Sequence, residues 1–197
     1  MKNQAPTASR TAGQASGRTS ARARLLAAAD QLFYENGINL VGIDRVIEHA
    51  GVAKASLYDC FGSKEELIRA YLKGRADKRQ ARISERIANL GTPREKILGV
   101  FDLLAELVTR TDYRGCAFQR ADAEAGVSSV IKGTCDESRA WLRSLFTELA
   151  RQARAPDPEL LGRQLVFLYD GASLAAHVDG DRSAPQAAKV LAAQMMP

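Results

Sequence analysis

Residues 42–61 read GIDRVIEHAGVAKASLYDCF, a pattern that predicts two short amphipathic helices joined by a sharp turn. Gly51 stands between the two helices, where a left-handed backbone conformation is open to glycine. The apolar positions that would face a common core are Val46, Ile47, Ala50, Leu57 and Phe61. Two helices joined in this way form a helix-turn-helix, whose second helix enters the major groove of DNA.

The sequence on either side also predicts helices, because Ala, Leu, Arg and Glu dominate and no run alternates as a strand would. Serine, threonine or aspartate followed by proline or glutamate marks several helix starts, and glycine marks helix ends. We expect three helices over residues 20–36, 43–50 and 53–60. A long fourth helix should begin at the capping box 63–66 and end before Gly91. Further helices should begin at 92–95, 157–158 and 183–186. The sequence therefore predicts an all-α fold.

Residues 73–82, KGRADKRQAR, have almost no apolar face, although Leu67 and Tyr71 before them and Ile83 and Ile87 after them do. This pattern predicts a long helix that is anchored in one core, crosses solvent and is anchored in a second core. A domain boundary would then lie within this helix. The charged side chains of this stretch could contact a ligand directly, or they could simply form a solvated face of the helix.

The chain has 197 residues and a net charge of +5. Residues 1–80 carry 13 basic and 8 acidic side chains, and the remainder carry 15 of each, so the positive charge lies in the first 80 residues. This asymmetry favours a polyanion-binding front, with a basic tail on a neutral globule as the alternative. Residues 1–18 are polar, with charges only at Lys2, Arg10 and Arg18, and predict a flexible basic arm.

No apolar run is long enough to cross a membrane, and the N-terminus lacks a signal peptide pattern. The three cysteines (Cys60, Cys116 and Cys135) are widely spaced, which favours a reducing cytoplasm over a disulfide framework. They are expected to be inert buried thiols, although oxidation of Cys60 would place a modification close to bound DNA. The two histidines do not have metal-ligand spacing, so we expect no metal and no cofactor.

Residues 20–72 resemble the DNA-binding region of TetR/AcrR-type transcriptional regulators in three motifs: the Ala-rich helix ending in LF…NG, then AGVAKASLY, then FGSKEEL. Residues 114–118, RGCAF, with Ala123-Glu124 after them, resemble the LmrA/YxaF-like branch. The resemblance implies a helix-turn-helix DNA-binding domain over 19–72 and a helical dimerisation and effector-binding domain over 73–197. It implies a cytoplasmic homodimer, most simply a repressor that an unknown small-molecule effector releases from a palindromic operator in double-stranded DNA.

The same resemblance assigns DNA contacts. Lys54, Ala55 and Ser56 would begin the recognition helix, where they can reach base edges or phosphates. The complete set of expected DNA-binding residues is Gly42, Arg45, Lys54, Ala55, Ser56, Tyr58 and Lys64. Tyr58 could instead be a packing aromatic, and Lys64 only a neighbour of the capping box. Departures from the family pattern at Ile47, Asp59 and Cys60 leave the operator sequence open.

In the second half, Leu160, Leu161, Leu165, Leu168 and Ala172 form a broad apolar stripe, extended by Phe167, Ala175 and Ala176. We expect residues 157–178 to form the dimer interface beside residues 185–196, with an ordinary core helix as the alternative. The aromatic candidates for an effector pocket, which could also be plain core, are Phe101, Phe118, Trp141, Phe146 and Tyr169.

Two other classes of function are disfavoured. An enzyme would need a nucleophile–base pair, a carboxylate dyad or metal ligands, and the sequence offers no such arrangement. A sequence-independent chromosome-compacting protein would carry basic residues throughout, whereas the second half of this chain is neutral.

Overall fold

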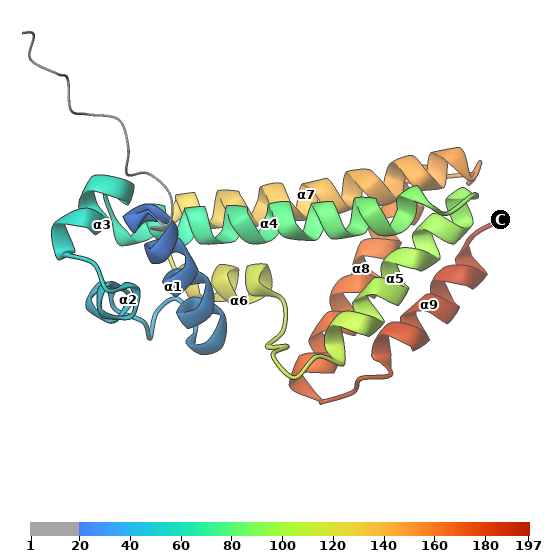
Figure 1. Ribbon diagram of the computed structural model, residues 1–197. Helices are drawn as coiled ribbons and strands as arrows, with labels where there is room; N and C mark the ends of the chain where they lie inside the picture. Colours follow the sequence, from blue (N-terminus) through green and yellow to red (C-terminus); the bar gives the residue numbers. More distant parts are fainter. Residues whose placement is uncertain (1–19) are drawn as a thin grey trace, which may run out of the picture.

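The computed structural model describes residues 20–197, which form nine α-helices and contain no strand (Figure 1). The predicted arm over residues 1–18 lies outside the described residues. The helices are α1 (Ala21–Asn36), α2 (Ile43–Ala50), α3 (Lys54–Phe61), α4 (Lys64–Ala88), α5 (Pro93–Val108), α6 (Ala117–Glu124), α7 (Ser129–Gln152), α8 (Pro158–Val178) and α9 (Ala184–Met195). The all-α prediction is confirmed.

The predicted helix-turn-helix is present as α2 and α3. Gly51 ends α2 at φ +61°, in the left-handed region that its position required. Val46 and Leu57 are fully buried in a core shared with Leu32 and Phe33 of α1. The second helix begins at Lys54, one residue later than predicted, because Ala53 has the extended backbone of an N-cap.

Local hydrogen bonds explain where the later helices begin. The capping box at Thr92 and Glu95 is complete, and Asp157 caps α8 by accepting from the Leu160 N–H at 2.9 Å. Only half of the box at Ser63 forms, because the Glu66 carboxylate pairs with Arg69. The box predicted at Ser183 was wrong, since that hydroxyl donates to Asp181 and does not cap α9.

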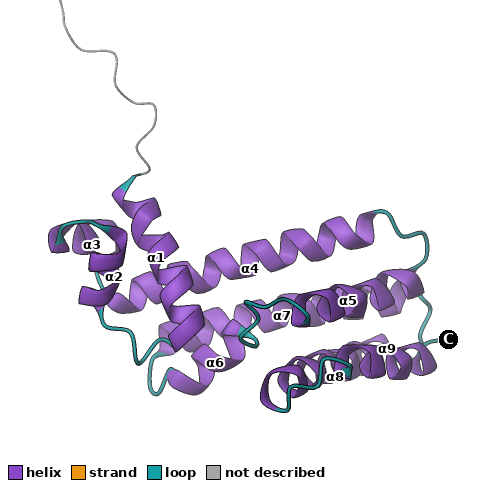
Figure 2. Cartoon of the chain, turned by 60° about the horizontal axis from the view of Figure 1, so that its bottom comes forward, coloured by secondary structure: helices purple, strands orange, loops and turns teal. Residues whose placement is uncertain are grey.

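The middle of α4 is solvated on one face, where Lys73, Asp77 and Lys78 are exposed, but not all round as predicted. Helix α7 lies along it (Figures 1 and 2), and Arg79 donates to the Ser138 carbonyl at 2.6 Å and to the Ser138 hydroxyl at 2.8 Å. On the other side, Arg75 pairs with Asp30 of α1 at 2.8 Å. One face of the polar stretch therefore makes polar packing contacts with neighbouring helices, through Arg75 and Arg79.

Two hydrophobic cores meet along α4. The first joins α1, α2, α3 and the start of α4 to α6 and the first turns of α7, through residues such as Phe118 and Ile131. The second core lies among α5, α7, α8 and α9, around Phe101 and Phe146. Helix α6 therefore packs with the DNA-binding half of the chain, against α1, α4 and the turn before α2, although it follows α5 in the chain.

Most of the apolar stripe predicted on α8 faces inward. Leu161, Leu165 and Ala172 are buried in the second core. Two members of the predicted apolar surface, Leu160 and Phe167, are exposed, and they share one face of α8 with the exposed Leu174 and Val178. Val190, Leu191 and Met195 of α9 are also exposed. The predicted stripe thus combines two faces of α8: most of its residues face the second core, and Leu160 and Phe167 belong to an exposed apolar face.

Candidate DNA-binding surface and ligand cavity

The first turns of α3 present a face that is free of core contacts. Lys54, Ala55 and Tyr58 are exposed, whereas Leu57 on the other side of the helix is fully buried. Ser56 is half-buried. Because positions 54, 55 and 58 lie on one side of a helix, these three side chains can contact one surface together.

Lys54 is tied to α2. Its ammonium lies 3.0 Å from the Asp44 carboxylate, and this hydrogen bond raises the pKa of Lys54 above its usual value. Both side chains are mostly exposed, so a phosphate or a base edge can compete for the lysine. The pair keeps Lys54 charged and holds it at the N-terminal end of the recognition helix.

The remaining predicted DNA contacts surround this face. Gly42 is the exposed N-cap of α2 and has no side-chain cap bond, so the first N–H groups of that helix remain open to an anion. Arg45 of α2 is exposed. Lys64, the first residue of α4, is half-buried, and this burial lowers its pKa. Its role as a DNA contact stays a prediction, as do the roles of the other six residues.

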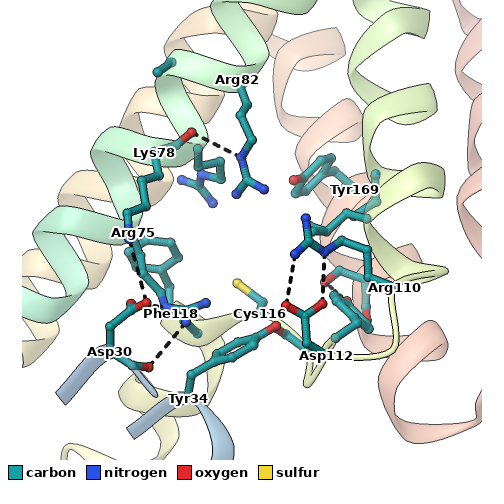
Figure 3. Close-up of a pocket in the computed structure, with 18 residues that line it drawn as sticks. Asp30, Tyr34, Arg75, Lys78, Arg82, Arg110, Asp112, Cys116, Phe118 and Tyr169 are labelled. Carbon is teal, nitrogen blue, oxygen red and sulfur yellow. Dashed lines mark hydrogen bonds and ion pairs between the residues drawn. The ribbon is translucent and has the colours of Figure 1, made fainter. Parts of the chain in front are cut away.

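A second candidate site is an open cavity of about 530 Å³ lined by α1, α4, the end of α5, the loop into α6, the start of α6, and α8 (Figure 3). Of the five aromatic residues predicted to line a pocket, Phe118 and Tyr169 do so. Phe101 and Phe146 lie behind Tyr169 as a stacked pair with ring centroids 5.9 Å apart, and Trp141 packs on the second core. Phe101, Phe146 and Trp141 therefore do not line the cavity and belong to the second core instead.

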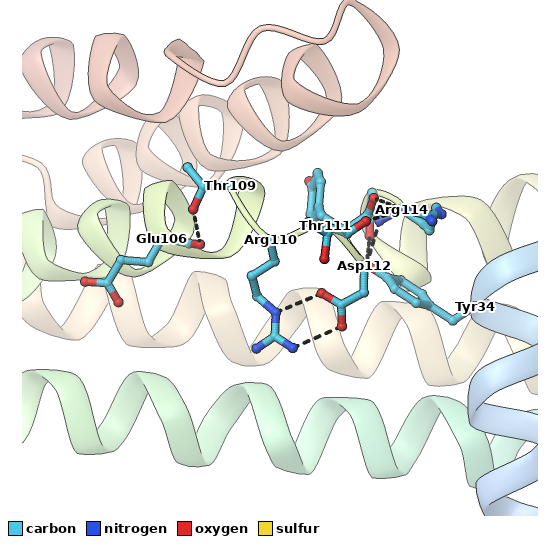
Figure 4. A network of polar contacts seen from close by, with 9 residues as sticks. Tyr34, Glu106, Thr109, Arg110, Thr111, Asp112 and Arg114 are labelled. Atoms are coloured by element: carbon cyan, nitrogen blue, oxygen red, sulfur yellow. Dashed lines mark hydrogen bonds and ion pairs between the residues drawn. The ribbon is translucent and has the colours of Figure 1, made fainter.

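Charged side chains line the same cavity, and four of them belong to the run 73–82 for which the sequence left a ligand role open: Arg75, Lys78, Arg79 and Arg82. Arg75 pairs with Asp30 and lies over the Tyr34 ring at 3.6 Å. Arg110, in the loop after α5, donates to both carboxylate oxygens of Asp112 at 2.9 and 3.0 Å (Figure 4). Arg82 extends into the cavity from α4, facing Arg110 on the opposite wall (Figure 3).

One side of the cavity is continuous with the contacts that join α6 and the loop before it to α1 and the turn before α2. The Tyr34 hydroxyl donates to the Gly115 carbonyl at 3.1 Å and accepts from the Arg114 N–H at 3.0 Å. The Asn39 backbone and side chain both donate to Glu124, each at 2.9 Å. A change in the position of α6 would therefore be transmitted to α1 and to the turn before α2.

Two of the three thiols are held in their protonated form. Burial raises the pKa of Cys116, on the cavity wall, and raises the pKa of Cys135 to about 12. Since the thiolate is the reactive species, these two cysteines fit the expectation of inert thiols. The redox role of the half-buried Cys60 remains a hypothesis.

Comparison with known proteins identifies the class of this chain. Residues 25–71 match the model of bacterial regulatory proteins of the tetR family. SCO4454, a TetR-family transcriptional regulator from Streptomyces coelicolor, is 30% identical with a TM-score of 0.78, covering 88% of this chain and 96% of its own. A structure from Streptomyces avermitilis described as a tetR-type regulator is 32% identical with a TM-score of 0.78, covering 90% of this chain and 100% of its own. The chain belongs to the TetR family.

TetR-family proteins are DNA-binding transcriptional regulators and not enzymes. The transcriptional repressor KstR2 of Mycobacterium tuberculosis is 34% identical over 92 residues, which span 47% of this chain and 44% of the relative. The transcriptional activator FasR of Mycolicibacterium smegmatis is 41% identical over 56 residues, 28% of this chain and 26% of its own. The chain thus matches less than half the length of these two relatives.

No helix in residues 20–197 could span a bilayer, and this part holds no cluster of three metal-binding side chains.

Proposed function

We propose that this TetR-family protein is a homodimeric, sequence-specific repressor that a small molecule releases from a palindromic operator. The observation that carries the proposal is the exposed face of Lys54, Ala55 and Tyr58 at the start of α3, flanked by the open N-terminus of α2. In this assignment residues 19–72 bind DNA, and residues 73–197 dimerise and bind the effector. A repressor of bacterial genes acts where the chromosome lies, in the cytoplasm.

The exposed apolar face of α8 and α9 supports dimerisation. Phe167 is 66% exposed, and Leu174 and Val178 follow on the same face of α8. A monomeric protein rarely exposes a contiguous patch of this kind, whereas a two-fold interface buries the same patch of both subunits. We therefore assign the dimer interface to the outer faces of α8 and α9.

The cavity and the α6 contacts support effector control. Asp30 and Tyr34 belong to α1 and line the cavity, and Arg75 of α4 contacts both. A ligand in the cavity would compete for these contacts and shift α4 and α6 relative to α1. The distance between the two recognition helices of the dimer would then no longer match the distance between the two half-sites of the operator.

The proposal is tested by fluorescence anisotropy with duplex DNA from upstream of the gene that encodes this protein. We expect binding roughly 10³-fold tighter than to a shuffled duplex at physiological salt. The affinity for both duplexes should fall as salt is raised, because phosphate contacts release counterions. Equal affinity for the two duplexes would contradict sequence-specific binding.

Two substitutions test the assignment of the recognition helix. Lys54→Ala is expected to weaken operator binding by about 1–3 kcal/mol, as for a specific contact, and Tyr58→Phe should weaken it because a phosphate loses a hydroxyl donor. Val127→Ala, a substitution of an exposed side chain in the turn between α6 and α7, serves as the control. Operator affinity unchanged in both variants would show that α3 does not contact the DNA through these residues.

A further inference from the structure

We propose that the cavity binds an organic anion, with its carboxylate or phosphate held by Arg79, Arg82 and Arg110 and its apolar body on the surrounding hydrophobic wall. This inference rests on the proposed function, because it names the chemical class of the effector. The charge, the hydrogen bonding and the shape of the cavity each support it.

The cavity contains more positive than negative charge. Five cationic side chains line it, but only two carboxylates do, those of Asp30 and Asp112. Asp30 lies 2.8 Å from Arg75 and 3.7 Å from Lys78, and Asp112 accepts two hydrogen bonds from Arg110. Among residues 20–197, neither Arg79 nor Arg82 forms an ion pair with a carboxylate; Asp170, which lines a neighbouring cavity together with Arg79, pairs with Arg139 at 2.6 Å. A bound anion would balance this charge, and a cation would add to it.

Arg79 has an unused hydrogen-bond donor. Its Nε is buried and has no acceptor in the described part of the chain, whereas another nitrogen of the same guanidinium donates to Ser138. The guanidinium also lies 4.7 Å from the centroid of the Phe118 ring, so the side chain is held in place from two sides. The Nε opens onto no free space, so an anionic oxygen in the cavity would interact with the charge of this guanidinium and would accept from Nε only after the side chain shifts.

The three arginines stand where two cavities adjoin. A second cavity of about 230 Å³, reaching Ile83 and Leu103, is also lined by Arg79, Arg82 and Arg110; the one carboxylate in its lining, Glu106, pairs with Arg86 at 2.5 Å. Leu104, Leu107 and Tyr169 line both cavities and give them apolar walls. The volumes suit a ligand of ordinary metabolite size, with a few polar groups that fix its orientation. The charged group would lie at the junction, and the apolar body would extend along the leucines.

Isothermal titration in the absence of DNA tests the inference with probes that share one apolar body: 4-phenylbutyrate, 4-phenylbutyl phosphate, 4-phenylbutanol and 4-phenylbutylamine. We expect at least one of the two anions to bind about ten- to a hundredfold more tightly than the alcohol, as for charge-assisted hydrogen bonds, and the amine to bind most weakly. Comparison of carboxylate with phosphate shows which headgroup the arginines prefer.

Arg82→Gln and Arg110→Gln should each remove most of the advantage of the anion while leaving the affinity for the alcohol unchanged. Arg143→Gln on the exposed face of α7, outside both cavities, is the matched control and should change neither affinity. The inference is overturned if the alcohol or the amine binds as tightly as the anions, if none of the four probes binds, or if both arginine variants keep the full preference. Each of these results leaves the DNA-binding measurements of the proposed function untouched.

Discussion

Replacement of Phe167 by aspartate is expected to convert the dimer into monomers and to reduce operator affinity by about 10²–10⁴-fold, the gain that linking two binding modules provides. Phe167 is 66% exposed in the single chain, and we place it at the centre of the interface on α8. Burial of one phenylalanine contributes about 1.5–3 kcal/mol, and a two-fold interface contains the residue twice. The variant would also bury an unpaired carboxylate from each subunit, which adds to the loss.

Sedimentation at micromolar protein concentration measures this effect directly. The unmodified protein should sediment at twice the chain mass of 21.4 kDa, and the variant at the chain mass itself. Val127→Asp is the matched control, because Val127 is fully exposed but lies in the turn before α7. A Phe167→Asp variant that remains dimeric, with Val127→Asp also dimeric, would move the interface away from the outer face of α8.

Gly162→Ala is expected to destabilise the fold by about 1–3 kcal/mol, the usual cost of overpacking. A Cβ at position 162 of α8 would overlap the Thr147 hydroxyl of α7 and lie 3.0 Å from the Thr147 backbone N and Cα. The hydroxyl could rotate away, but the backbone of α7 could only move as part of the helix. The two helices must therefore separate locally, and the second core, which both line, would lose contacts.

A second glycine provides the control for the loss of stability expected of Gly162→Ala. Gly133→Ala on α7 places its Cβ in open space, so it should stabilise the helix by about 0.5–1 kcal/mol through the unfolded state. Urea unfolding of both variants at one protein concentration gives the two free energies. Destabilisation by Gly133→Ala as large as that by Gly162→Ala would indicate a general intolerance to substitution and would contradict the steric argument.

The sequence was sufficient for features that depend on neighbouring residues. Gly51, the Asp157–Pro158 start and the capping box at Thr92 each act within one helical turn, so the helix boundaries follow from local chemistry. The burial of Val46 and Leu57 follows from the helical period alone. These positions make the helix-turn-helix predictable from its own twenty or so residues.

Features that join distant parts of the chain were not predictable. The contact of Asn39 with Glu124 spans 85 residues, and that of Arg79 with Ser138 spans 59. A run such as KGRADKRQAR has the composition of a solvated surface, and only α7 lying beside it makes it a packing surface. Both faces of α8 are apolar, so periodicity could not tell the core face from the exposed one. The charged lining of the cavity follows from such arrangements of helices.

Selection of bound duplexes from random DNA tests the central proposal, a dimer that reads two half-sites, most directly. We expect the enriched sequences to share an inverted repeat whose half-site centres lie about 34–36 Å apart, or a multiple of this distance, as for two symmetry-related recognition helices. Lys54→Ala should enrich the repeat less strongly than the unmodified protein does. Recovery of no common sequence, or of a single asymmetric motif without a second half-site, would contradict the account.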